Sequence, residues 1–180
     1  MREILLPALR LFGLLTILTG VGYPLVVTAI GYAFFRESAG GSLIRCDGTV
    51  AGSALLAQKF TSRRYFWPRP SAADFLTVPS GASNSGPVSK VLQASVAKRR
   101  STIGTDAPDD LLTSSGSGLD PHVSPRAARF QATRVALARG LAISRVNSVI
   151  ESHLERPQLG ILGEPRINVL LLNLALDELQ

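Results

Sequence analysis

The feature that most constrains this chain is a run without a single charged side chain, from Leu11 to Phe35. Arg10 precedes the run and Arg36 follows it. About 20 apolar residues in a helix cross the hydrocarbon core of a bilayer. Only helices and closed barrels satisfy their backbone polar groups there. The sequence therefore predicts a short tail over residues 1–10 and one transmembrane helix, in contact with membrane lipid, over residues 11–35.

A cleaved signal peptide is the main alternative for this run. Its apolar core is typically about 7–15 residues long and is followed by small residues at the cleavage site. The run here is longer, and Phe34, Phe35 and Arg36 make a poor cleavage site, so we expect an uncleaved anchor. Arginines nearly balance on the two sides, and long domains translocate largely regardless of charge. We place the N-terminus in the cytoplasm and residues 36–180 outside it.

Small residues form a stripe on one side of the expected helix. At about 100° per residue, four of them point within about 40° of one direction: Gly13, Gly20, Pro24 and Gly31. Small residues let helix backbones approach closely in lipid, so the stripe predicts a packing face for a partner helix. Glycine is also common in membrane helices generally, which is the simpler explanation. Pro24 cannot donate a backbone hydrogen bond and is expected to kink the helix.

Residues 36–180 are predicted to form one compact soluble domain with an α+β fold. The 180-residue chain is 46% hydrophobic, so it can bury a core without disulfides, and its single cysteine excludes an intrachain one. Proline and glycine signals predict helices over residues 87–103, 125–139 and from 144 toward Pro157. Short strands are expected within residues 48–60, 111–114 and 166–176, although periodicity alone does not exclude a helix in the last of these.

Three adjacent aromatic residues, Tyr65, Phe66 and Trp67, open a proline-rich segment. Proline disfavours helix in the residue before it, so residues 65–71 should be extended. Side chains on an extended chain point alternately to opposite sides. We therefore expect one or two of these rings to pack into the domain and the rest to be available to a partner.

No motif in the sequence predicts chemistry by the chain itself. The glycine-rich loops lack the lysine of a phosphate-binding loop, and the surroundings of Ser117 do not match the Gly-x-Ser-x-Gly elbow of hydrolases. Asp120 and His122 lie nearby, but residues so close along a chain rarely form a triad. A turn into a helix capped by Ser124 explains them. Two histidines without further ligands predict no metal site, and we expect no cofactor bound by the chain's own residues.

The formal net charge of +6 is spread along the chain. Nucleic-acid binding would require a basic stripe with interleaved aromatics, which is absent, so no nucleic-acid partner is expected. The positive balance instead suits an anionic membrane surface or an acidic partner.

Several segments, taken in order, resemble one bacterial family. They are the paired Thr19-Gly20 and Tyr23-Pro24 of the span and residues 52–60, 65–71, 114–125, 163–170 and 172–177. Over essentially its whole length the chain is similar to the C subunit of the Kdp-type bacterial potassium-transporting P-type ATPase. The most specific part is residues 114–125, the signature loop, whose marked positions are Ser115, Gly116, Ser117, Gly118, Asp120, Pro121 and His122. One departure lies in the loop at 80–87, where Ala82 and Ser85 replace the usual Gly and Leu.

The resemblance implies a single-pass accessory subunit of an ATP-driven potassium import complex in the bacterial inner membrane. Its partners would be the pore-forming potassium subunit and the ATP-hydrolysing P-type subunit, which would handle K⁺ and ATP. The family is described as a catalytic chaperone that raises the ATP affinity of the hydrolysing subunit. A domain outside the cytoplasm does not touch cytoplasmic ATP, so this effect would be allosteric. The marked loop positions would serve partner contact or structure.

Two other functions stay open at this point. In the first, the domain faces the cytoplasm and binds nucleotide directly. In the second, the chain is an anchored extracytoplasmic hydrolase that uses Ser117 and His122.

Overall fold

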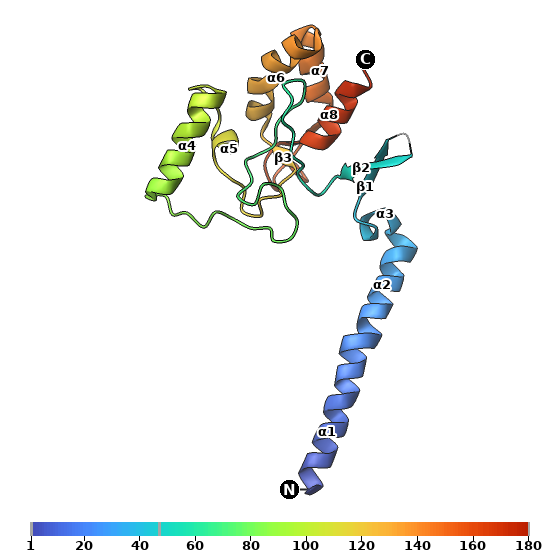
Figure 1. Ribbon diagram of the computed structural model, residues 1–180. Coiled ribbons are helices and arrows are strands. Elements are labelled where there is room, and N and C mark those ends of the chain that lie inside the picture. Colours follow the sequence, from blue (N-terminus) through green and yellow to red (C-terminus); the bar gives the residue numbers. More distant parts are fainter. Residues whose placement is uncertain (1, 47, 180) are drawn as a thin grey trace. The chain divides into compact units, whose positions relative to one another are not determined.

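The computed structural model describes residues 2–46 and 48–179 (Figure 1). It shows an α+β chain in which an N-terminal apolar helix is followed by a compact mixed domain, as the sequence predicted. The chain divides into two compact units, Met1–Ala51 and Gly52–Gln180. Each unit is described separately below.

The first unit begins with the expected apolar helix. Helix α1 (Arg2–Ile17) leads through a π-helical turn, η1 (Leu18–Gly22), into α2 (Tyr23–Phe34). Its 31-residue stretch Ile4–Phe34 is long and apolar enough to cross a membrane. Residues 2–10, expected as a tail, continue the helix. The apolar stretch therefore begins before Arg10.

The π-helical turn lies directly before Pro24. The backbone N–H of Tyr23 donates to the carbonyl of Leu18, five residues back. Such a turn contains an extra residue, and it is a common place for a helix to accommodate an interrupted hydrogen-bond ladder. It also rotates α2 relative to the position that a uniform 100° step would give. Gly13 and Gly31 therefore do not share one unbroken stripe, and the packing face stays a prediction for each half of the helix.

A short helix and a two-stranded sheet follow α2 along the chain. Helix α3 (Arg36–Ala39) is followed by β1 (Leu43–Cys46) and β2 (Thr49–Ser53), which form a two-stranded sheet. A turn with a hydrogen bond from Leu56 N to Ser53 O follows β2. This confirms the expectation of a short strand entering a turn within residues 48–60.

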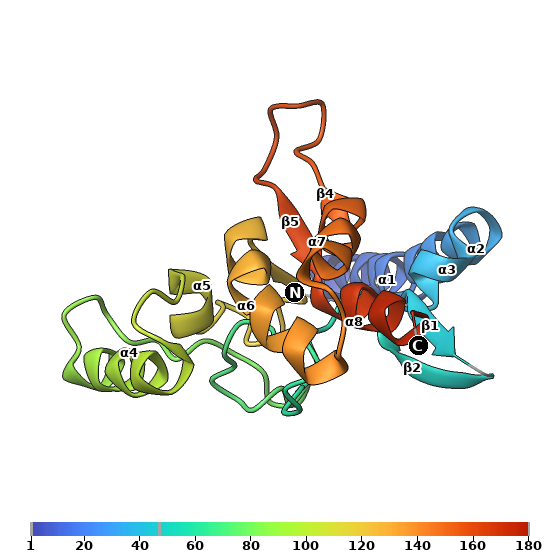
Figure 2. The same cartoon turned by 90° about the horizontal axis from the view of Figure 1, so that it is seen from above.

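The second unit packs helices around a small antiparallel sheet. Strands β3 (His122–Val123), β5 (Arg166–Asn168) and β4 (Leu154–Glu155) lie in that order, with His122 opposite Asn168 and Leu154 opposite Ile167. Helices α6 (Pro125–Arg139), α7 (Ile143–Ser152) and α8 (Val169–Asp177) gather around it (Figure 2). The core they share includes Phe66, Val135, Ile150, Ile167 and Leu172.

Helices α6 and α7 follow the sequence signals closely. Ser124 caps α6, since its hydroxyl accepts a hydrogen bond from Ala127 N, and Gly140 ends the helix at a φ of 66°. The alanine face of α6 is buried, with Ala127 fully so. Helix α7 buries Val146 and Ile150, and it ends at Ser152 rather than continuing toward Pro157 as predicted.

The C-terminal segment corrects one prediction. Residues 166–176 were expected to form a buried strand, yet only Arg166–Asn168 is a strand and α8 follows at once. The side chain of Asn168 caps this helix by accepting hydrogen bonds from Leu170 N and Leu171 N. A capping amide inside a continuous apolar run starts the helix, and the apolar pattern alone does not reveal it.

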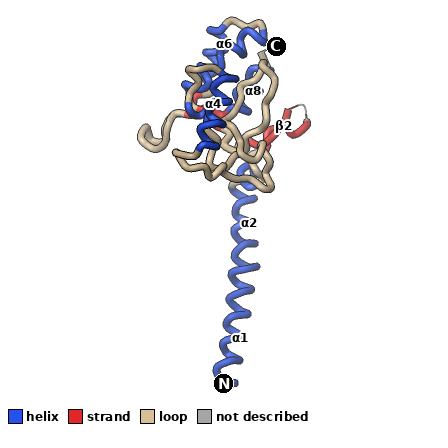
Figure 3. The backbone as a smooth tube through the Cα atoms, turned by 60° about the vertical axis from the view of Figure 1, so that its left-hand side comes forward, coloured by secondary structure: helices blue, strands red, loops and turns tan. Residues whose placement is uncertain are grey.

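Two further expectations change in the middle of the chain. Residues 111–114 were predicted as a strand, but Asp109–Leu112 is a short helix, α5, with Pro108 and two aspartates at its start. Acidic residues favour a helix N-terminus. Helix α4 runs from Lys90 to Ile103, so Pro87 precedes it rather than opening it. The segment from 54 to 89 contains neither helix nor strand (Figure 3), as expected for residues 65–71 and 80–87.

Candidate functional site

The signature loop lies where three distant segments of the domain meet. Three backbone hydrogen bonds join it to them: Ala57 N to Leu119 O (2.9 Å), Ser115 N to Pro70 O (3.3 Å) and Val169 N to Pro121 O (2.9 Å). The loop therefore connects three stretches: residues 52–60, the proline-rich residues 65–71, which we call the aromatic segment, and the start of α8. All four of these stretches carry the resemblance noted in the sequence.

Two of the marked positions in this loop have clear steric and hydrogen-bonding roles. Gly118 has a φ of 72°, and a Cβ there would lie 2.9 Å from the carbonyl oxygen of Gly81 and 3.2 Å from the Ser71 hydroxyl. Only glycine fits such a position without strain. The Ser117 hydroxyl accepts a hydrogen bond from Leu119 N. By contrast, a Cβ at Gly116 would meet nothing within 4 Å.

Asp120 and His122 belong to a network of alternating charges. Asp120 Oδ1 accepts a hydrogen bond from His122 N at 3.0 Å, and Asp120 Oδ2 lies 3.3 Å from Arg69 Nη1. On its other side, His122 Nε2 lies 3.9 Å from Glu155 Oε1. Glu155 Oε2 in turn pairs with Arg166 Nε at 2.8 Å. Four residues of this network, Arg69, Asp120, His122 and Arg166, line a cavity of about 600 Å³ together with Asp109, Asp110 and Arg126.

The network holds Asp120 in its ionised form. Burial by itself would raise the pKa of this carboxyl group. Hydrogen bonds from the side chain and backbone of His122, together with the charges of Arg69 and His122, outweigh burial and leave the pKa of Asp120 below its ordinary value of 3.8. A carboxylate bound in this way is suited to holding the turn before α6.

The arrangement does not assemble a catalytic triad from the residues first considered. The hydroxyl of Ser117 is used in its own turn, whereas the ring nitrogens of His122 face Asp120 and Glu155. Within residues 2–46 and 48–179 no group of three or more His, Cys, Asp or Glu side chains could hold a metal ion. His153 is half-buried at the end of α7, with Nδ1 2.9 Å from Val149 O.

The aromatic segment is held by two side-chain amides. Asn173 of α8 bonds both backbone groups of Phe66, and Gln131 of α6 bonds both backbone groups of Trp67. Phe66 is fully buried in the core, while Tyr65 and Trp67 remain half-buried. Since successive side chains alternate in direction, burying Phe66 directs Trp67 away from the core.

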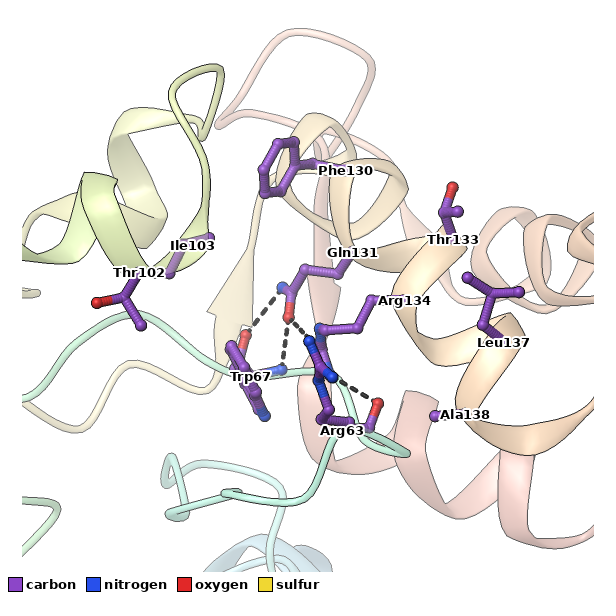
Figure 4. A pocket seen from close by; sticks show the side chains of 10 residues that line it. All are labelled: Arg63, Trp67, Thr102, Ile103, Phe130, Gln131, Thr133, Arg134, Leu137 and Ala138. Atoms are coloured by element: carbon purple, nitrogen blue, oxygen red, sulfur yellow. Dashed lines mark hydrogen bonds between the residues drawn. The ribbon is translucent and has the colours of Figure 1, made fainter.

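Trp67 forms part of a groove between α4 and α6, which we call the Trp67 groove. One cavity of about 600 Å³ is lined by Arg63, Trp67, Thr102, Ile103, Phe130, Gln131, Thr133, Arg134, Leu137 and Ala138 (Figure 4). A second cavity of about 470 Å³ shares Trp67, Thr102 and Ile103, and adds Ser95, Lys98 and Arg99.

Arg134 is fixed within this groove. Its guanidinium carbon lies 3.8 Å from the centre of the Trp67 ring. The guanidinium donates to the carbonyl of Arg63 and to Gln131 Oε1 (Figure 4). It also donates to the carbonyl of Tyr65. Burial, and next the nearby charge of Arg63, lower the pKa of Arg134 to about 10. The group still carries its charge at neutral pH.

Sequence reasoning singled out Trp67 but missed the polar residues that position it. Gln131 and Arg134 lie in a helix that was predicted from its proline and glycine signals, and Asn173 lies in a run that was expected to be a strand. An amide within an apolar run, as with Asn173 between Leu172 and Leu174, is a usable signal, because a buried polar group requires a partner.

The predicted packing face of the membrane helix has room beside it. Among the described residues, a Cβ at Gly13 or Gly20 would meet no heavy atom within 4 Å beyond its chain neighbours and the backbone of its own helix, whereas one at Gly31 would lie 3.7 Å from Ala39 Cβ. Pro24, at the start of α2, is exposed. Glycine at positions 13 and 20 is therefore not required by contacts within the chain itself.

Comparison with known proteins gives consistent matches over the whole chain. The family model described as "K+-transporting ATPase, c chain" matches residues 5–178. The potassium-transporting ATPase KdpC subunit of Rhodospirillum rubrum is 53% identical, covering 99% of this chain and 97% of that protein. The KdpC subunit of Cereibacter sphaeroides is 50% identical over 95% of both chains, and that of Paraburkholderia phytofirmans is 46% identical over 100% and 99%.

Proposed function

Because the chain belongs to the family of K+-transporting ATPase c chains, we propose that it is a non-catalytic accessory subunit of an ATP-driven potassium import complex. It assists the assembly of the complex and raises the ATP affinity of the hydrolysing subunit. Its partners are the pore-forming subunit and the ATP-hydrolysing P-type subunit, which handle K⁺ and ATP. It resides in the bacterial inner membrane with its N-terminus in the cytoplasm and residues 36–180 outside.

The observation that carries this proposal is the extent of the family match, which includes the membrane span as well as the domain. The structure adds support of a second kind. The hydroxyl of Ser117 and the carboxylate of Asp120 bond backbone groups of their own loop, which favours a scaffold over a reaction centre. The space beside Gly13 and Gly20 favours a neighbouring helix in the bilayer.

The proposed effect on ATP affinity acts at a distance. A domain outside the cytoplasm changes nucleotide binding only if it binds two states of the complex with different affinity. By the same linkage, ATP binding to the hydrolysing subunit changes the affinity of the complex for this chain.

The test is a reconstitution with and without this chain. The pore-forming and P-type subunits are purified alone and with the chain, and K⁺-dependent ATPase rates are measured across ATP concentrations. The expected result is co-purification and a lower KM for ATP when the chain is present. An unchanged KM for ATP would contradict the chaperone role. Failure of the chain to co-purify with the two subunits would contradict the accessory role altogether.

Orientation is tested separately with protease. In sealed right-side-out vesicles, added protease is expected to digest residues 36–180. Protection of the domain would contradict the proposed orientation and would favour direct contact with cytoplasmic nucleotide.

A further inference from the structure

The Trp67 groove is an elongated surface feature that the family match does not assign. Its two cavities, of about 600 and 470 Å³, meet at Trp67, Thr102 and Ile103. Arg63 lines only the first cavity, and Lys98 lines only the second. The two cavities therefore share the Trp67 ring and the Ile103 side chain, and each cavity has an exposed cation that the other lacks.

The helices that form its walls are strongly basic. Helix α4 contains four lysines and arginines, and α6 contains four arginines, with no acidic residue in either. Arg129 and Arg139 of α6 pair with Glu151 and Asp177. Among the described residues, the cations that line the groove have no carboxylate within 4.0 Å: Arg63, Lys98, Arg99 and Arg134. Their positive charge is left for an external group.

The α4 wall also lacks packing of its own. None of its 14 residues is buried, although a helix of this length is marginally stable unless an apolar face packs. Across the groove, Leu137 is 80% exposed and Phe130 is only half-buried. An occupant that covered these apolar groups would stabilise α4 against α6.

We propose that the Trp67 groove binds an acidic peptide segment of another subunit of the same complex. Its carboxylates face Arg63 and Lys98, and an apolar side chain between them covers Trp67 and Phe130. The unpaired cations of the groove argue that the peptide is acidic. Arg134 stacks on the Trp67 ring and holds it in place, so the ring is already positioned to contact an apolar side chain. This inference rests on the proposed function, because the segment comes from a partner subunit.

A peptide fits these observations better than an anionic lipid headgroup. A phosphate is bound most tightly where several donors converge on it. Here Arg99 already donates to Leu112 O, and Arg134 donates to the carbonyls of Arg63 and Tyr65. The two exposed cations, Arg63 and Lys98, line different cavities. An extended segment reaches both, whereas a single phosphate does not.

The experiment uses a photo-reactive side chain at position 137 in the complete complex, purified in detergent. Irradiation is expected to cross-link this position to one segment of another subunit that contains Asp or Glu, identified by mass spectrometry. Arg63→Glu with Lys98→Glu should lower the cross-link yield about tenfold, because attraction becomes repulsion at both ends. Lys90→Glu with Arg145→Glu is the matched control and should leave the yield unchanged.

The decisive arm is a charge exchange. Replacing the acidic residue of the cross-linked segment with Lys should restore the yield in the Arg63→Glu, Lys98→Glu complex. If that variant unfolds at a lower temperature than wild type, Arg63→Gln with Lys98→Gln takes its place. Three outcomes would each overturn the inference. They are equal cross-link yields in the groove and control variants, a cross-link to lipid, and no cross-link in an intact complex. Loss of the wild-type complex on purification would instead refute the proposed function.

Discussion

The side-chain amide of Asn173 bonds both backbone polar groups of Phe66, accepting from its N–H at 2.8 Å and donating to its carbonyl at 3.0 Å. Gln131 does the same for Trp67, at 2.9 and 3.1 Å. Two amides, one from α8 and one from α6, thus replace the neighbouring strand for two consecutive residues. They determine that Phe66 enters the core and that Trp67 faces the groove.

Removing one of these amides should strongly destabilise the domain. In Asn173→Leu, the buried N–H and carbonyl of Phe66 lose their partners, which costs about 2–4 kcal/mol in free energy of unfolding. Urea unfolding of the full chain in detergent, followed by Trp67 fluorescence, measures this. Asn147→Leu on α7 changes a half-buried amide outside this pairing and should cost less than about 0.5 kcal/mol. Equal losses in the two variants would contradict the assigned role.

Arg139 joins the ends of α6 and α8. Its side chain is fully buried, and it donates to Asp177 Oδ1 at 2.7 Å, to Arg64 O at 2.7 Å and to Leu176 O at 2.9 Å. Arg139→Met removes the buried donor of all three bonds, so we expect a loss of about 3 kcal/mol in unfolding free energy.

The exposed pair formed by Arg129 and Glu151 is the control for this prediction. Both side chains are 53% exposed, so Arg129→Met should cost less than about 1 kcal/mol. The same urea titration compares the two variants. A loss for Arg139→Met no larger than for Arg129→Met would show that the buried contacts do not stabilise the domain.

Much of the fold could be predicted from local signals. The uncharged run gave the membrane helix, and Ser124, Pro125 and Gly140 set the limits of α6. The strand expected over residues 166–176 was wrong, because a continuous apolar run fits either a buried strand or a buried helix. The deciding group, Asn168, acts through a cap that the apolar pattern does not reveal.

The candidate site was less predictable, because its contacts join residues far apart in the chain. Trp67 stood out as the only tryptophan, but Gln131, which positions it, is 64 residues away. Arg69 and Asp120 are likewise 51 residues apart. Periodicity and motif spacing describe neighbours along the chain, so they do not report such pairs.

The pH dependence of stability should carry the signature of Asp120. Its pKa is lowered in the folded chain, so it contributes stability above its unfolded pKa and loses it as the pH falls through the folded value. Asp120→Asn keeps an acceptor for His122 N but removes the charge beside Arg69. At pH 7 we expect it to cost about 1 kcal/mol.

Thermal or urea unfolding from pH 7 to pH 2 measures this difference. The gap between wild type and Asp120→Asn should stay constant above about pH 5 and shrink below about pH 4, as Asp120 takes up its proton. A gap that does not change with pH would mean that the lost stability is unrelated to the carboxylate charge.

The last prediction concerns the membrane helix. In the part of the chain that the structure describes, a Cβ at Gly13 meets no heavy atom within 4 Å outside its own helix backbone and chain neighbours, so Gly13→Leu should leave the isolated subunit folded. If a partner helix packs against that side, the larger side chain separates the two backbones. Close packing of small residues is a main source of helix association in lipid, and a loss of about 1.4 kcal/mol corresponds to about a tenfold weaker association.

Retention of the chain during purification of the complex in mild detergent measures the effect. Ala8→Leu is the matched control, because it enlarges another exposed residue of α1 that points about 140° away from Gly13 on a uniform helix. Gly13→Leu should reduce retention about tenfold and Ala8→Leu should not. Equal retention of the two variants would mean that no partner helix packs against Gly13, because a leucine side chain does not fit where a glycine lets two helix backbones pack closely.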